Sequence, residues 1–152
     1  MRRSLWLALL AMAVLMIAGC GRDEENGGGG GDPGITDDEI KIGGSYPFSG
    51  PASAYRSIAE GAKAQFEFVN AKGGVDGRKI NFITLDDAYE PPKAVQNARR
   101  LIEEEQVFAL FNTLGTPTNT AIHKYMNQKK VPQLFVATGA TIVDMDFFEA
   151  LG

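Results

Sequence analysis

The folded part of this 152-residue chain is predicted to be α/β, a doubly wound parallel sheet. Two features of the sequence predict this class. First, two kinds of segment alternate along the chain. Some are short and apolar at every second position or throughout, as in strands, and the others have apolar residues every three or four positions, as in helices. The connections are short, which is typical of strand–helix–strand units with right-handed crossovers and helices on both faces of the sheet.

The expected strands are short and mostly apolar. In the first, Ile40 and Ile42 lie two positions apart and therefore on one face. The second is apolar on both faces near its end, which predicts that both faces are covered. The third, VFALF, contains only apolar residues. The four strands are expected at 39–46, 79–85, 107–111 and 134–136.

Amphipathic helices are expected between these strands. In the first helix, at 54–72, the apolar residues fall on one side: Ile58, Ala62, Phe66 and Val69. The second helix, at 91–105, opens with a pair of prolines, which suit the first turn of a helix, and the third spans 117–129.

The loops after the strands are the candidate binding segments. In a doubly wound sheet, ligands bind in the crevice outside the carboxyl ends of the strands. The loops that we expect at that edge are 47–55, 86–92, 112–117 and 137–141.

The N-terminus has the plan of a secretory signal peptide, expected at 1–19. Arg2 and Arg3 precede an apolar run at 5–18 that contains no charged residue. The run is shorter than the roughly 20 apolar residues that span a bilayer. We therefore expect cleavage and export rather than permanent insertion.

Cys20 is the expected site of lipid attachment. The residues Ile17-Ala18-Gly19-Cys20 resemble the lipobox of bacterial lipoproteins, whose cysteine receives lipid and becomes the mature N-terminus. The alternative is a short membrane anchor with an incidental buried cysteine. Cys20 is the only cysteine, so no internal disulfide is possible. The residues at 20–34 are rich in glycine and are expected to form a flexible tether, which leaves 35–152 as the folded part.

The charge balance excludes some partners. Of the 15 basic side chains, two would leave with the signal peptide, so the 19 acidic side chains clearly outnumber the rest. We therefore expect neither nucleic-acid binding nor electrostatic binding of basic side chains to anionic lipid. The membrane contact would come from the lipid alone.

The order of several motifs resembles the N-terminal lobe of type I periplasmic binding proteins. The match covers 40–141, whereas 142–152 departs from the family's pattern. The motifs, in order, are IKIGGSYPFSGPASAY, GAKAQFEFVNAKGGVDGRKI, LDDAYEPPKAVQNARRLI, GTPTNTA and FVATGAT. The most similar members would be the branched-chain amino-acid receptors of ATP-binding-cassette (ABC) transporters and their kin for other small carboxylates or amides.

This resemblance implies a role and a set of partners. The chain would be the extracytoplasmic solute-binding component of an ABC importer, with an amino acid or related small molecule as ligand and a membrane permease as partner. It would perform no covalent chemistry and hold no cofactor. Family members have a second lobe, so 35–152 is expected to be an incomplete first lobe, from a truncated or frameshifted gene. Such a lobe would bind its ligand weakly or not at all.

The loop before the third helix has the chemistry to hold an anion. Thr116 and Pro117 suit the N-cap and first position of the helix, so free backbone N–H groups there could bind a carboxylate. The Thr116 and Thr118 hydroxyls are expected to assist. The resemblance implies the following ligand-binding residues: Tyr55, Gly115, Thr116, Gly139 and Thr141. Many relatives have Ser where this chain has Gly115, so one hydroxyl contact is lost.

Each of these residues has a structural alternative. Thr116 could only cap its helix, Tyr55 could cover the sheet edge, and Gly139 could serve backbone geometry alone. Adjacent Asp86 and Asp87 point to opposite faces of a strand, which favours a strand-end turn over a metal or acid–base pair. The single histidine, His123, has no ligand-type residue three or four positions away, which favours a surface or interface residue over a metal site.

Two classes of function stay open. The first is the solute receptor described above. The second is a lipid-anchored sensory or regulatory α/β domain without a transport role. An enzyme is not expected, because the sequence shows neither a nucleophile with its base nor a cofactor-binding loop. In the family, the group that recognises an amino acid's ammonium lies largely in the second lobe, so amino acid, aromatic acid and amide ligands stay undistinguished.

Overall fold

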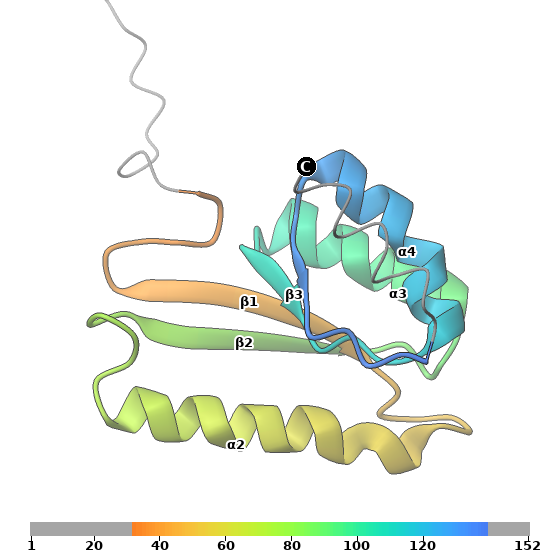
Figure 1. The fold of residues 1–152 in the computed structure, drawn as a ribbon, viewed down its shortest axis with the longest axis horizontal. Coiled ribbons are helices and arrows are strands. Elements are labelled where there is room, and N and C mark those ends of the chain that lie inside the picture. Colours follow the sequence, from red (N-terminus) through yellow and green to blue (C-terminus); the bar gives the residue numbers. More distant parts are fainter. Residues whose placement is uncertain (1–31, 140–152) are drawn as a thin grey trace, which may run out of the picture. The chain divides into compact units, whose positions relative to one another are not determined.

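Four strands pair in parallel to form one sheet, in the order β2-β1-β3-β4 (Figure 1). The computed structural model describes residues 32–139. The strands are β1 (Glu39–Tyr46), β2 (Lys79–Asp86), β3 (Ala109–Phe111) and β4 (Gln133–Leu134). The helices are η1 (Ser53–Arg56), α2 (Ser57–Ala71), α3 (Pro91–Arg99), the π-helical turn η2 (Arg100–Glu104) and α4 (Thr116–Lys129).

The strand order makes β1 the point where the winding reverses. The chain passes through α2 to reach β2 on one side of β1, and then returns through α3 to reach β3 on the other side. Helix α2 lies on one face of the sheet, and α3 and α4 lie together on the other (Figure 1). The predicted doubly wound α/β class is confirmed.

The face covered by α3 and α4 holds the aliphatic core. Ala94 and Ala98 let α3 approach the sheet closely, and Leu101 in η2 packs between them and the strands. A Cβ atom on Gly43 of β1 would lie 2.8 Å from a methyl carbon of Leu101. The helix layer therefore rests directly on the backbone of the central strand. The rest of this core is Val107, Leu110, Ile122 and Met126.

The face covered by α2 is aromatic. Phe66 of α2 meets Phe82 of β2 and Phe111 of β3 edge to face, with ring centroids 5.1 and 5.2 Å apart. Tyr46 is fully buried beside them, and its hydroxyl donates to the carbonyl oxygen of Phe111 at 2.6 Å. Burial raises the pKa of Tyr46, so the phenol stays a donor and joins the end of β1 to the end of β3.

The ends of several elements differ from the expected ones. The helix expected at 54–72 begins as the 3-10 turn η1, and the helix expected at 91–105 ends in the π turn η2. The strand expected at 134–136 is instead Gln133–Leu134. It stops there because Phe135 has a φ of +55° and is 75% exposed, so its backbone leaves the sheet.

The fold begins slightly before the expected boundary at residue 35. The carbonyl oxygen of Gly34 accepts a hydrogen bond of 2.7 Å from the amide of Lys41, so the last residue of the expected tether is bonded to β1. Within residues 32–139, no helix is long and apolar enough to cross a membrane. The signal peptide, Cys20 and Thr141 lie outside the described residues.

Candidate ligand-binding site

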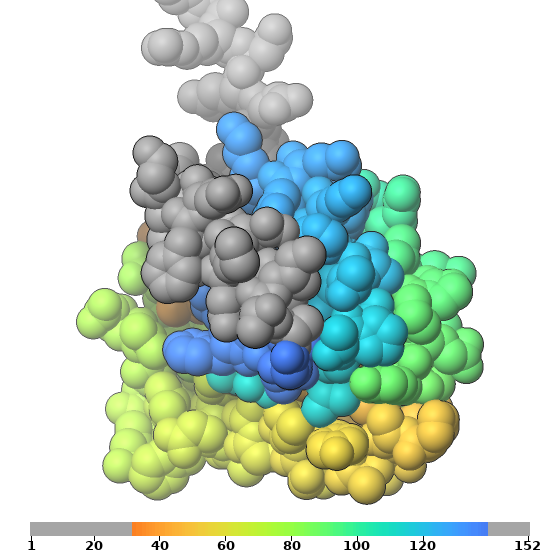
Figure 2. All heavy atoms as spheres, turned by 45° about the vertical axis from the view of Figure 1, so that its right-hand side comes forward, coloured from red at the N-terminus to blue at the C-terminus, as the bar shows by residue number. Residues whose placement is uncertain are grey.

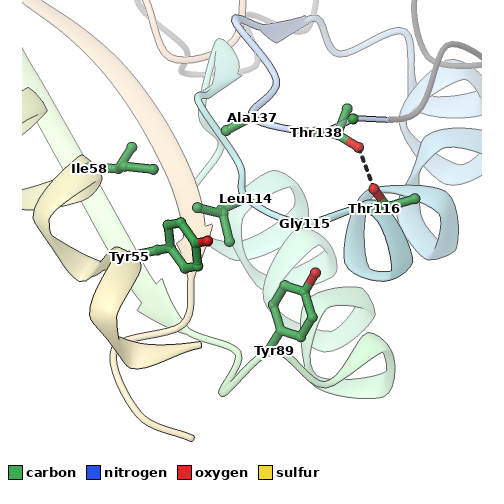
Figure 3. Close-up of a pocket in the computed structure, with 9 residues that line it drawn as sticks. Tyr55, Ile58, Tyr89, Leu114, Gly115, Thr116, Ala137 and Thr138 are labelled. Carbon is green, nitrogen blue, oxygen red and sulfur yellow. Dashed lines mark hydrogen bonds between the residues drawn. The ribbon is translucent and has the colours of Figure 1, made fainter. Parts of the chain in front are cut away.

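An open hollow of about 310 Å³ lies at the carboxyl ends of the strands (Figure 3). All four loops expected at that edge contribute to it. Figure 2 shows the beginning of α2 beside the segments that begin α3 and α4 on one side of the molecule. The lining residues are Tyr55, Ile58, Tyr89, Leu114, Gly115, Thr116, Ala137, Thr138 and Gly139.

Backbone hydrogen bonds bring two of these loops together. Beyond the last paired residues of β3 and β4, the amide of Gly115 donates to the carbonyl oxygen of Ala137 at 2.9 Å, and the amide of Ala137 donates to that of Thr113 at 3.0 Å. The two threonine hydroxyls that follow, on Thr116 and Thr138, lie 2.8 Å apart (Figure 3). After the break at Phe135, an isolated parallel bridge between Leu114 and Ala137 thus resumes the pairing and forms one rim of the hollow.

The N-terminus of α4 begins one residue earlier than expected. Gly115, with a φ of +104°, is the N-cap, and Thr116 is the first helical residue, so the expectation that Thr116 caps the helix is wrong. The amides of a helix's first turn have no partner inside the helix. Here these are the amides of Thr116 and Thr118, because Pro117 has none and Gly115 donates to Ala137. The geometry suits an anion.

The Thr118 hydroxyl does not assist at this site. Thr118 is buried, and its Oγ1 lies 2.5 Å from the carbonyl oxygen of Leu114 and 3.0 Å from that of Gly115. The expectation that it helps to hold a carboxylate is wrong, because a residue at the third position of α4 turns its side chain back toward the cap. The exposed Thr116 hydroxyl stays at the rim with that of Thr138.

A buried amide that sequence reasoning missed holds the cap in place. The Asn119 Nδ2 group donates to the carbonyl oxygens of Gly115 at 2.7 Å and Thr113 at 3.1 Å, while Asn119 Oδ1 accepts from the Thr113 hydroxyl at 2.6 Å. These bonds fix the loop between β3 and α4. The sequence feature that could have indicated this role is an asparagine in the first turn of a helix that follows a strand.

The other expected positions fall at the edge of the hollow. Tyr55 is 57% exposed and lines the hollow from η1, so its ring is not packed into the core. Gly139 also lines it, and a Cβ atom there would meet nothing within 4 Å. Thr141 lies outside the described residues, whereas Thr138 and Tyr89, which we did not expect, are part of the lining.

The two aspartates after β2 shape the loop that carries Tyr89. Asp86 accepts hydrogen bonds from the Ser49 hydroxyl at 2.5 Å and the Ala88 amide at 2.9 Å. Asp87 is fully buried, and it accepts from the Ser45 hydroxyl at 2.7 Å and the Tyr89 amide at 2.8 Å. The pair therefore forms a strand-end turn, in agreement with the favoured alternative.

The pKa values of these two carboxyls are shifted in opposite directions. Burial raises the pKa of Asp87, and the nearby charge of Asp86 adds to this effect, against the hydrogen bonds from Ser45 and Tyr89 and the charge of Lys93. Partial burial also acts upward on the pKa of Asp86, but hydrogen bonds from Ser49 and Ala88 outweigh it and leave that pKa below its usual range.

Between residues 32 and 139, no three His, Cys, Asp or Glu side chains gather as metal ligands would. His123 is half-buried on α4, with Nδ1 2.8 Å from the carbonyl oxygen of Thr120. The hollow offers backbone amides, hydroxyls and apolar carbon, which is the chemistry of binding rather than of bond breaking.

Comparison with known proteins points to one family. A model described as periplasmic binding protein matches residues 39–146. Leu/Ile/Val-binding protein homolog 7 of Brucella suis is 38% identical over 95 residues, which are 62% of this chain and 24% of that protein. The chain spans about a quarter of the length of the curated relatives it matches.

Solved structures agree with this match. A possible leucine/isoleucine/valine-binding protein from Rhodopirellula baltica superposes with a TM-score of 0.67 at 32% identity, over 71% of this chain and 30% of that one. The branched-chain amino acid transporter substrate binding protein LivJ from Streptococcus pneumoniae, in complex with isoleucine, gives a TM-score of 0.65 at 26% identity, over 70% and 31%.

Gly115→Ala is expected to destabilise the fold by about 1–3 kcal/mol, because a side chain at a φ of +104° is strained. The added Cβ would also lie 2.4 Å from the Tyr89 ring. Gly61→Ala is the matched control: its Cβ meets nothing within 4 Å on α2, so it should stabilise by about 0.5–1 kcal/mol. Urea unfolding of the full chain measures both, and equal effects would contradict the argument.

Asp87→Asn tests the raised pKa of the buried carboxyl. The folded chain holds the Asp87 proton more tightly than the unfolded chain does. The stability advantage of the natural aspartate over the asparagine variant should therefore be largest at low pH and decline as pH rises through the raised pKa. Asp86→Asn should show the opposite slope, because the pKa of Asp86 is lowered. Free energies of unfolding measured from about pH 2.5 to 7 decide it, because the Asp86 effect lies below the usual pKa of an aspartate and the Asp87 effect above it; slopes of the same sign would refute one of the two assignments.

Proposed function

The chain belongs to the periplasmic binding protein family, and we propose that it forms one wall of the ligand site of an extracytoplasmic receptor for an ABC importer. It is a homologue of branched-chain amino-acid substrate-binding proteins, a family of binding proteins rather than enzymes. The proposed ligand is an amino acid or a similar small carboxylate, and the proposed partner is a membrane permease.

The observation that carries this proposal is the pairing of an anion-binding helix end with an apolar floor. The amides of Thr116 and Thr118 lie at the positive end of the α4 dipole. The apolar floor beside them comes from Ile58, Leu114 and Ala137 (Figure 3). A molecule with a carboxylate at one end and a hydrocarbon body at the other matches both parts.

We assign the ligand contacts to positions on the rim of this hollow. Those supported by the lining are Tyr55, Gly115, Thr116 and Gly139, and Thr141 is retained from the family resemblance. Gly115 and Gly139 would contribute backbone groups, and Thr116 an amide and a hydroxyl. No basic side chain is among the lining residues of the described part, so the helix end supplies the positive potential.

Affinity at this wall alone should be low. The hollow is open, so a ligand seated in it keeps much of its surface in water. We propose that a second lobe covers the other side of the ligand in the working receptor and that closure of the two lobes supplies most of the affinity.

The 152-residue chain is expected to bind L-isoleucine with a dissociation constant in the millimolar range, which is about 4 kcal/mol. Amide NMR measures this, with the Thr116 and Thr118 signals moving most. The matched control is 2-methylbutylamine, which is isoleucine without its carboxylate and should leave those signals in place. Micromolar affinity would refute the claim that this chain contacts only one side of the ligand. No response to isoleucine at tens of millimolar would refute the proposed site.

We also propose that the chain is exported and held at a membrane by lipid on Cys20. Support comes from the basic start, the apolar run at 5–18 and the residues Ile17-Ala18-Gly19 before the cysteine. In a bacterium that expresses the chain, labelled palmitate should enter the protein, and Cys20→Ser should abolish the label. Label that persists in Cys20→Ser would show that the lipid is elsewhere, and an unlabelled parent chain would refute lipidation.

A further inference from the structure

Tyr89 occupies the space in which a side chain at position 115 would lie. A Cβ atom on Gly115 would be 2.4 Å from Cε2 of Tyr89 and 3.2 Å from Cδ2. Cε2 neighbours the carbon that bears the hydroxyl, so the polar end of the ring is the part that comes closest. Figure 3 shows this ring directed toward Gly115 and Thr116 from the loop between β2 and α3.

The loop holds Tyr89 there against its own backbone preference. Ala88 and Tyr89 have φ values of +51° and +65°, a region that side chains with a Cβ rarely adopt. The two carboxylates compensate, because Asp86 accepts from the Ala88 amide and Asp87 from the Tyr89 amide. Two partly buried hydrogen bonds therefore define the backbone position of the tyrosine.

Asp87 is itself anchored in the sheet. The Ser45 hydroxyl that donates to it also accepts from Asn97 Nδ2 at 3.0 Å, which connects β1, the turn and α3 in one network. A second restraint comes from Gly50, where a Cβ atom would lie 2.6 Å from the carbonyl oxygen of Ala88. Hydrogen bonds and this close approach therefore fix the backbone of the loop that carries Tyr89 to the hollow.

The Tyr89 phenol can supply a side-chain hydrogen-bond donor, which Gly115 lacks. Gly115 offers a carboxylate no side-chain donor, and the Thr118 hydroxyl is committed to the carbonyl oxygens of the cap. A phenol hydroxyl can donate one hydrogen bond, and bonds to an ionised acceptor are the stronger kind. Beside the first-turn amides of α4, the Tyr89 hydroxyl would complete the set of donors around a carboxylate.

We propose that Tyr89 is a specificity-determining residue of this site and that its hydroxyl donates to the carboxylate of the bound ligand in the place left by Gly115. The proposal rests on the proposed function, since it requires a carboxylate ligand at the N-terminus of α4. It adds a residue that neither the motifs nor the expected contacts had assigned. It also gives Gly115 a role, because any side chain at that position would displace the tyrosine ring.

The test is Tyr89→Phe, which keeps the ring and its packing and removes only the hydroxyl. With the full chain and L-isoleucine as probe, the titration midpoint of the Thr116 amide signal should rise about threefold to tenfold. L-isoleucinamide, whose carbonyl is uncharged, should lose less affinity than isoleucine does. The matched control is Tyr125→Phe on α4, which loses a hydroxyl bond to Glu103 away from the hollow and should leave the midpoint unchanged.

The outcomes separate the two proposals. If the unaltered chain binds isoleucine and Tyr89→Phe binds it equally well, Tyr89 is not a ligand contact, while the proposed site stands. If Tyr89→Phe weakens isoleucine and isoleucinamide by the same factor, the hydroxyl acts only on loop structure, and the proposal is overturned. If the unaltered chain does not respond to isoleucine, the proposed function fails and this proposal fails with it. Unchanged amide signals of Ile122 and Met126 in the core establish that the variant is folded.

Discussion

Two backbone hydrogen bonds beyond the ends of β3 and β4 determine where the site lies. By joining Gly115 to Ala137 and Ala137 to Thr113, they form an isolated parallel bridge three residues past the paired residues Phe111 and Leu134. Because all four strands are parallel, every such extension emerges at the same edge of the sheet. The start of α4, the segment after β4 and the turn after β2 are neighbours for this reason.

At Gly43 and Gly115, the absence of a side chain lets a residue from another element come close to the backbone. At Gly43, Leu101 lies directly on the central strand and lets α3 and η2 pack close to it, and at Gly115 the Tyr89 ring reaches the cap of α4. The first contact belongs to the core and the second to the hollow. In both, a residue from one crossover fills the space that a Cβ on another element would need, so a side chain at either glycine would require that residue to move.

Features with a regular period could be predicted from the sequence, and features set by single backbone conformations could not. Strand β1 was predicted at its observed limits because alternation and a following turn mark both ends. The end of β4 depends instead on Phe135, whose positive φ accompanies a bond of 2.9 Å from Asn112 Nδ2 to its carbonyl oxygen. The cap at Gly115 likewise depends on Asn119, and Tyr89 reaches the hollow only through a turn of two left-handed residues. No local pattern encodes such tertiary contacts.

The distribution of buried polar groups explains why the rim of the hollow has one defined shape. In the described part of the chain, the buried polar side chains are Ser45, Asp87, Thr113, Thr118 and Asn119. All of them lie at the carboxyl end of a strand, in the turn after it or in the first turn of α4, and each is hydrogen-bonded. Apolar groups in those places would cost less to bury, but they would tolerate many loop conformations. Groups that must keep specific partners tolerate few, so this edge gives up some stability to hold its amides and hydroxyls in one arrangement.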